Sequence, residues 1–166
     1  MTVSDPKSTS PKGRHDDAAR YRVLLEIARK LAATLSEDEL YGAIYRETAR
    51  AVDATGFYIA LHDQTRDLAR VVFYVDRGEA NRVDVPYRGS DSKVIRSRKA
   101  SLENGDLRKD ALMVLGDESE VAVAAITAPM VHHGRVLGAI SAQSYEAGAY
   151  TEDDLHLLEG IADVAA

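Results

Sequence analysis

The sequence predicts an α+β domain in which helices at both ends of the chain enclose an antiparallel sheet. Two observations support this fold class. Near both ends, apolar residues recur at three- and four-residue steps, which is the period of a helix with one buried face. Between the ends, aromatic and β-branched runs alternate with polar turns, which is typical of strands joined as hairpins.

Composition indicates one globular domain. The 166 residues are 45% hydrophobic and 29% charged, which suits a single core and is too apolar for a disordered chain. A net charge of −6 would repel a phosphate backbone, so nucleic acid is not an expected partner. The chain has no cysteine, which excludes disulfides, a cysteine nucleophile and a chromophore attached through a thioether.

Residues 1–17 are predicted to be a disordered tail or linker, and residues 18–166 the folded domain. The first segment is rich in Ser, Thr, Pro, Lys and Asp and has little apolar surface to bury. It lacks the apolar core of a signal peptide, and no apolar run is long enough to cross a bilayer. We therefore expect a cytoplasmic domain with no membrane segment.

Two helices are expected before Gly56. Ser36 begins the second, because its hydroxyl can accept from the Glu39 amide while the Glu39 carboxylate reaches back, forming a capping box. The apolar stripe of the first helix also contains a seven-residue repeat that suits a coiled-coil seam. The stripe consists of Tyr21, Leu24, Leu25, Ala28, Leu31, Ala32 and Leu35.

Hairpins are expected in the middle of the chain. Strands 57–62 and 68–75 are joined by a polar turn, and 83–87 is a short edge strand because Pro86 cannot donate to a ladder. Strands 121–131 and 135–144 are joined at His133-Gly134, where glycine tolerates the positive φ of a tight turn.

The segment 88–120 is the least regular part of the sequence. A short helix is expected from Ser92 to Arg98, and loops are marked by Asn104-Gly105 and Gly116. This segment could form the lid of a pocket.

A final helix begins after Thr151, which caps it. Its buried stripe is Leu155, Leu158, Ile161, Ala162 and Ala165. Because no C-terminal capping residue follows, we expect the helix to lead on into further chain beyond Ala166 in the parent protein.

Two segments near the end of the chain, RVLGAISAQSYE (135–146) and AYTEDDLHLLEGIA (149–162), resemble the C-terminal signature of GAF domains. GFYIALHD (56–63) and SKVIRSRKA (92–100) resemble the first strand and pocket helix of that family, in the same order. The resemblance begins at about Leu24. It implies a central antiparallel sheet with the N- and C-terminal helices on one face and a short-helix and loop segment covering a pocket on the other.

The resemblance also implies a function. GAF domains are non-catalytic sensory modules, here of a bacterial signalling protein whose expected parent is a two-component histidine kinase or a diguanylate cyclase. A small ligand, or a signal relayed through the terminal helices, would control an output domain. The ligand is unknown: without cysteine a bilin cannot be held covalently and reductase chemistry is excluded, and the cyclic-nucleotide signature of some relatives is not found.

Strand alternation identifies the candidate site. Ser141 and Gln143 lie on one face of the last strand, and Gly138 and Ile140 on the other. By the resemblance, the second face packs under the terminal helices and the first faces a ligand cavity. The candidate ligand-binding residues are Tyr58, Ala60, Thr127, Ser141, Gln143 and Arg96. The alternative is that these polar groups only satisfy nearby backbone atoms.

Two further clusters of side chains have simpler interpretations than a ligand or metal site. Arg88, Lys93, Arg96, Arg98 and Lys99 could attract an anionic ligand, but basic side chains on a short exposed helix are more often a solvated surface. His132 and His133 could suggest a metal, but neighbours on a strand point to opposite faces, so no metal site is expected. No catalytic motif occurs, and the domain is not expected to be an enzyme.

A homodimer is expected through the terminal helices. The apolar stripe of the first helix is wider than packing on one sheet requires, and Leu157 and Val164 lie off the main stripe of the last helix. The rival to the sensory function is therefore a dimerisation scaffold whose pocket is filled by its own side chains.

Overall fold

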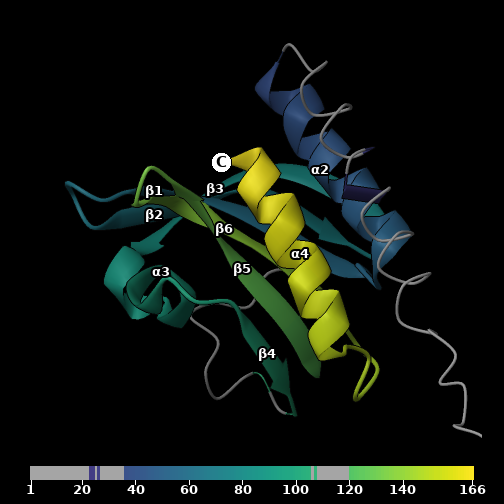
Figure 1. The fold of residues 1–166 in the computed structure, drawn as a ribbon. Helices are drawn as coiled ribbons and strands as arrows, with labels where there is room; N and C mark the ends of the chain where they lie inside the picture. Colours follow the sequence, from purple (N-terminus) through teal and green to yellow (C-terminus); the bar gives the residue numbers. More distant parts are fainter. Residues whose placement is uncertain (1–22, 25, 27–35, 106, 108–119) are drawn as a thin grey trace, which may run out of the picture.

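The computed structural model contains one antiparallel sheet, with strand order β3-β2-β1-β6-β5-β4 across the described residues (Figure 1). The structure describes residues 23, 24, 26, 36–105, 107 and 120–166. The strands are β1 (Gly56–Asp63), β2 (Leu68–Asp76), β3 (Glu79–Arg88), β4 (Ser101–Asn104), β5 (Ala124–His132) and β6 (Arg135–Ser144). The helices are α2 (Glu37–Ala51), η1 (Gly89–Asp91), α3 (Lys93–Ser97) and α4 (Glu152–Ala165). This arrangement confirms the predicted α+β class.

Some predictions lie outside the described residues. These are the tail at 1–17, most of the first helical stripe, and residues 108–119 of the predicted lid. The domain boundary at residue 18 stays a prediction.

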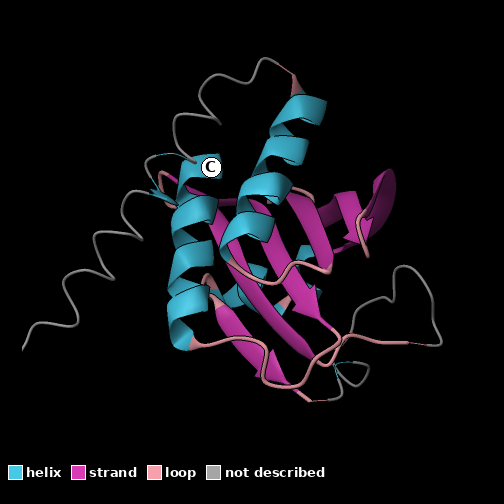
Figure 2. Cartoon of the chain, turned by 90° about the vertical axis from the view of Figure 1, so that its right-hand side faces the viewer, coloured by secondary structure: helices cyan, strands magenta, loops and turns pink. Residues whose placement is uncertain are grey.

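The two longer helices, α2 and α4, cover one face of the sheet (Figure 2). Their apolar stripes meet the helix-facing residues of the strands in one core, where Phe57, Ile59, Ile126, Ile140 and Leu158 are fully buried. Ile140 thus lies on the face that alternation predicted. Leu24 packs on α4 as well, because a Cβ at Gly160 would lie 2.6 Å from a Leu24 methyl carbon.

Both helices begin at capping side chains, although one differs in detail from its prediction. Thr151 and Asp154 form a complete capping box on α4. Ser36 accepts from the Glu39 amide at 3.3 Å, but the Glu39 carboxylate accepts from the Ser36 hydroxyl at 2.9 Å rather than from the Ser36 amide. The α2 cap is therefore half of the predicted box.

A β-bulge in β2 changes which side chains of this strand point to each face of the sheet. The pairing of β1 with β2 shifts between Val71 and Phe73, which leaves Val72 as an extra residue. Ala69, before the bulge, packs under α3, whereas Phe73 and Val75, after it, face the α2 and α4 core. The same shift places Tyr74 opposite Tyr58, on the α3 side of the sheet.

The short helix α3 covers the other face. Its Val94 and Ile95 pack on Ala69, Val136 and Ala139 in a second, smaller core. Ser92 caps α3 by accepting from the Ile95 amide at 3.3 Å, and Arg98 ends it in the left-handed conformation at φ 59°. The helix expected from Ser92 to Arg98 is therefore present.

Three strand predictions were incomplete. β3 is longer than the predicted 83–87 but does lie at an edge, and β5 begins at Ala124 rather than Val121. β4 was not predicted, because its four residues, Ser-Leu-Glu-Asn, are too few to show a clear period.

Candidate ligand-binding cavity

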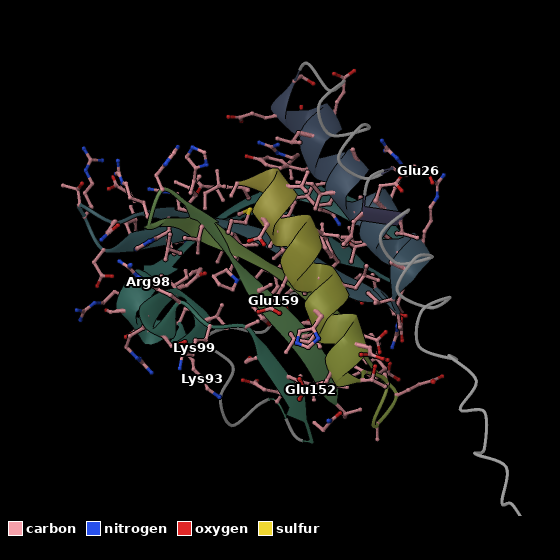
Figure 3. All side chains as sticks on the ribbon, viewed as in Figure 1. Glu26, Lys93, Arg98, Lys99, Glu152 and Glu159 are labelled. Carbon is pink, nitrogen blue, oxygen red and sulfur yellow. The ribbon has the colours of Figure 1, made fainter. Side chains whose placement is uncertain are left out.

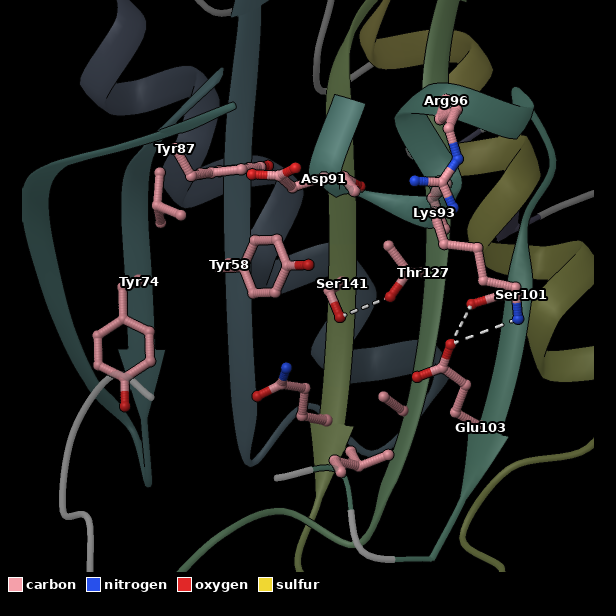
Figure 4. Close-up of a pocket in the computed structure, with 16 residues that line it drawn as sticks. Tyr58, Tyr74, Tyr87, Asp91, Lys93, Arg96, Ser101, Glu103, Thr127 and Ser141 are labelled. Atoms are coloured by element: carbon pink, nitrogen blue, oxygen red, sulfur yellow. Dashed lines mark hydrogen bonds and ion pairs between the residues drawn. The ribbon is translucent and has the colours of Figure 1, made fainter. Parts of the chain in front are cut away.

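A cavity of about 420 Å³ lies between the sheet and the η1–α3 segment. Its volume is in the range of small-molecule sites. All six strands contribute side chains to it, together with the η1–α3 segment, and Figure 4 shows these side chains as sticks. The lining residues are Tyr58, Val71, Tyr74, Tyr87, Asp91, Ser92, Lys93, Val94, Arg96, Ser101, Glu103, Leu107, Ala125, Thr127, Ser141 and Gln143.

The floor of the cavity carries a short hydrogen-bonded group. The Thr127 and Ser141 hydroxyl oxygens lie 2.9 Å apart on paired positions of β5 and β6, and Ser141 donates to the Ile126 carbonyl at 3.3 Å. Tyr58 joins them from β1, where it pairs with Ser141. Burial raises the pKa of Tyr58, although its hydrogen bonds with Ser141 and Thr127 act in the opposite direction. These groups present neutral donors and acceptors to the cavity.

Two more tyrosines line the side formed by β2 and β3. Burial raises the pKa of Tyr74 to about 12, with a smaller contribution from the Asp76 carboxylate. Burial also raises the pKa of Tyr87, with a further contribution from Tyr58. All three phenols are therefore neutral at physiological pH and can both donate and accept hydrogen bonds.

The η1–α3 segment and the edge strand β4 bring charged side chains to the cavity. Lys93 of α3 lies 3.8 Å from the Glu103 carboxylate of β4, which also accepts from the Ser101 hydroxyl at 3.2 Å (Figure 4). Arg96 donates to the Ser90 carbonyl at 2.7 Å. Asp91 adds a second carboxylate. The described lining residues thus include two cationic and two anionic side chains, and the balance does not single out an anionic ligand.

Five of the six candidate residues line the cavity: Tyr58, Thr127, Ser141, Gln143 and Arg96. Ala60 is not among the described lining residues. It is fully buried and pairs with Ala139, which packs under Val94 and Ile95 of α3. The face of β1 was right, but α3 covers the sheet at this position, so Ala60 lies beneath the helix.

Sequence reasoning missed Tyr74, Tyr87 and Glu103. Tyr87 lies two residues from Val85 in an alternating run, so its face could have been found once β3 was aligned with β2. Tyr74 could not, because the bulge at Val72 changes the face along β2. Glu103 belongs to the strand that was not predicted.

The two other clusters have clear places in the fold. Lys93, Arg98 and Lys99 gather around α3 with exposed side chains (Figure 3). The prediction that His132 and His133 point apart was wrong: their rings lie edge to face with centroids 4.2 Å apart. His133 sits in the turn at φ 46°, so strand alternation no longer applies to it. Within the described residues, no group of three or more ligating side chains could hold a metal ion.

The fold and cavity define a class of protein: an α+β domain with helices on one face of an antiparallel sheet and a ligand-sized cavity on the other. The family model described as "GAF domain" matches residues 34–166. The chain belongs to the GAF domain family. A search among curated proteins found no match.

Solved structures with a similar fold come from several kinds of protein. The GAF domain of an Acinetobacter phosphoenolpyruvate-protein phosphotransferase has a TM-score of 0.69 at 15% identity, over 89% of this chain and 90% of that one. Free methionine-R-sulfoxide reductase from Neisseria meningitidis, in complex with its substrate, has a TM-score of 0.70 at 13% identity, over 99% and 93%. A methyl-accepting chemotaxis protein has a TM-score of 0.65 at 14% identity, over 84% and 92%. At these identities the likeness concerns the fold alone.

GAF domains are sensory and regulatory modules, which agrees with the class expected from the sequence. No helix among the described residues has the length and apolar character needed to span a membrane.

Proposed function

We propose that this domain is a non-catalytic sensor that binds a small polar organic molecule in the cavity between the sheet and the η1–α3 segment. The observation that carries the proposal is the floor, where Tyr58, Thr127 and Ser141 place three neutral hydroxyl groups in a cavity of about 420 Å³. A scaffold without a ligand has no need of such a cavity, because filling the space with apolar side chains would avoid the free-energy cost of burying polar groups.

The signal would pass through the sheet. On β6, Ser141 lines the cavity, while the preceding residue, Ile140, is fully buried in the core formed with α2 and α4. A ligand that binds one packing of the floor more tightly shifts the population toward that packing. The terminal helices then carry the change to an output domain, and a histidine kinase or a diguanylate cyclase is the proposed parent.

A thermal-shift screen with a panel of metabolites tests the binding step. Stabilisation follows from binding to the native state alone, and at 100 times the Kd it is worth about 2.7 kcal/mol. The same panel is applied to Thr127→Val, which keeps the shape of the floor but removes one hydroxyl. A compound that raises Tm in the wild type and much less in Thr127→Val supports the proposal, whereas equal shifts place its binding elsewhere.

The second candidate function is a dimerisation scaffold, which Val164 favours. This residue of α4 is 40% exposed, and Leu157 on the same helix is half-buried. Leu24 is a poor probe of this surface, because it packs on Gly160 within the chain. Sedimentation equilibrium of Val164→Glu is the direct test. A dimer in the wild type that becomes a folded monomer in the variant would support the interface, and a monomeric wild type at high concentration would exclude it.

A further inference from the structure

A cluster outside the cavity attaches the cavity wall to the β1–β2 turn. Asp67 of this turn makes three hydrogen bonds with the start of η1. Its main-chain carbonyl accepts from the Gly89 amide at 3.1 Å, and its two carboxylate oxygens accept from the Ser90 amide at 2.8 Å and the Ser90 hydroxyl at 2.6 Å. Asp67 therefore fixes the position of Gly89 and Ser90 against the sheet.

Hydrogen bonds connect Ser90 in turn to α3, which forms part of the cavity wall. The Ser90 carbonyl accepts from Arg96 of α3 at 2.7 Å, and the Ser92 carbonyl accepts from the Arg96 amide at 2.9 Å. Arg96, together with Asp91 and Ser92, lines the cavity. A movement of Ser90 away from Asp67 would therefore displace residues that line the cavity. We call the group of His62, Asp67 and Ser90 the latch.

His62 adds a titratable group to the latch. Its side chain is only 7% exposed, and its Nδ1 lies 3.2 Å from the Val136 carbonyl. Because a carbonyl only accepts, Nδ1 carries the proton in the neutral ring, and Nε2 has a lone pair. That buried Nε2 has no hydrogen-bond partner among the described residues, and it lies 4.0 Å from an Asp67 carboxylate oxygen. Two acceptors thus face each other across a short gap.

Tight packing keeps this arrangement in place. A Cβ at Gly89 would overlap the His62 ring at Nε2, so η1 can approach the ring only because residue 89 is glycine. A proton on Nε2 would convert the unpartnered acceptor into a donor that lies 4.0 Å from the Asp67 carboxylate oxygen. An ion pair would then replace the contact of two acceptors, and a closer approach of about 1 Å would make it a charge-assisted hydrogen bond.

We infer that protonation of His62 tightens the latch, so that pH regulates the wall of the ligand cavity. The inference rests on the proposed function for its biological meaning, but the latch can be tested without a ligand. Asp67, from the turn, favours the charged ring. Arg88, whose Nε lies 3.6 Å from Asp67 at the end of β3, opposes it, as do Arg96 and Arg98 at the C-terminal end of α3. When His62 is protonated, the η1–α3 segment opens less often.

Nuclear magnetic resonance of the full ligand-free chain tests this inference. The His62 ring is titrated between pH 5 and 8, and the exchange protection of the Ser90 and Arg96 amides is measured over the same range, each rate divided by its intrinsic value at that pH. We expect protection of both amides to rise as His62 becomes protonated, with the same midpoint. Protection that does not change through the His62 titration would overturn the inference.

Two variants separate the latch from a general effect of pH. In His62→Asn, the amide can still donate to the Val136 carbonyl but cannot titrate, so protection becomes independent of pH in this range. In Asp67→Asn, the amide oxygen can still accept from Ser90, and asparagine tolerates the φ of 51° at this position. The charge is lost, so His62 still titrates but protection no longer follows it.

The outcomes distinguish this inference from the proposed function. If a variant does not fold, the wild-type titration and the other variant still decide the matter. Protection that follows pH equally in the wild type and in His62→Asn overturns the latch, even if a cavity ligand has been found. A working latch in a protein that binds no ligand contradicts only the proposed function.

Discussion

The hydroxyl groups of Thr127 and Ser141 lie 2.9 Å apart on adjacent strands at the floor of the cavity. Either hydroxyl can be the donor to the other, and the phenol of Tyr58 is hydrogen-bonded to both. The three groups together therefore offer both donors and acceptors to a ligand. The floor favours a polar ligand that can exchange hydrogen bonds with hydroxyl groups.

Thr127→Val tests whether this hydroxyl serves a ligand or the fold. The exchange removes one partly buried hydrogen bond, and we expect unfolding in urea to show a loss of about 1 kcal/mol. Thr65→Val, in the exposed β1–β2 turn, is the control and should change stability little. A loss of more than about 3 kcal/mol, the upper range for an unsatisfied buried polar group, would mean that the hydroxyl is primarily structural.

Ile140→Asp tests the assignment of the strand faces. Ile140 is fully buried in the core between the sheet and the two longer helices, so an aspartate would bury an unpaired charge and prevent folding. Leu61→Asp is the control, because Leu61 is 37% exposed. Circular dichroism melting decides the outcome: a soluble Ile140→Asp protein with a cooperative transition would show that the faces are reversed.

Gly138→Ala should be destabilising although alanine is small. A Cβ at Gly138 would overlap the Ala60 carbonyl of β1, so the two strands must separate, at a cost of about 1–3 kcal/mol. Gly42→Ala in the middle of α2 meets only the end of the flexible Arg46 side chain, and should raise stability by about 0.5–1 kcal/mol. Chemical denaturation of both variants should give shifts of opposite sign, and a neutral Gly138→Ala would refute the close strand contact.

Acid should weaken the attachment of the cavity wall through Asp67. Hydrogen bonds from the Ser90 hydroxyl and amide, with Arg88 nearby, hold the pKa of this carboxyl below its ordinary 3.8. The folded state therefore gains stability from Asp67 above about pH 3.8 and loses it as pH falls through the lower folded value. Tm should fall less steeply between pH 5 and pH 2.5 in Asp67→Asn than in the wild type. Parallel Tm curves would contradict this prediction.

Local patterns predicted most of the fold because they act over few residues. The capping of α4 by Thr151, the stripe through Leu155 and Leu158, and the turn at His133-Gly134 each depend on neighbours in the sequence. Alternation along β6 likewise separated Ser141 from Ile140, and hence the cavity face from the core face.

The remaining parts of the site depend on contacts between segments that are distant in the sequence. The alternation of residues along one strand does not predict such contacts. The bulge at Val72 reverses the face of Tyr74, and Ala60 is covered because α3 docks on Ala139. β4 is defined by its pairing with β5 rather than by its own period. The latch joins residues from β1, its turn and η1, which only the folded chain brings together.

Native mass spectrometry of the domain purified from its source organism tests the sensory function most directly. Wild-type protein and Thr127→Val, expressed in the same cells, are sprayed under conditions that preserve weak complexes. We predict a small organic molecule bound at one copy per chain to the wild type and largely lost from the variant. A wild-type protein that carries no such molecule, or equal retention by both proteins, would contradict the assignment of the cavity as a ligand sensor.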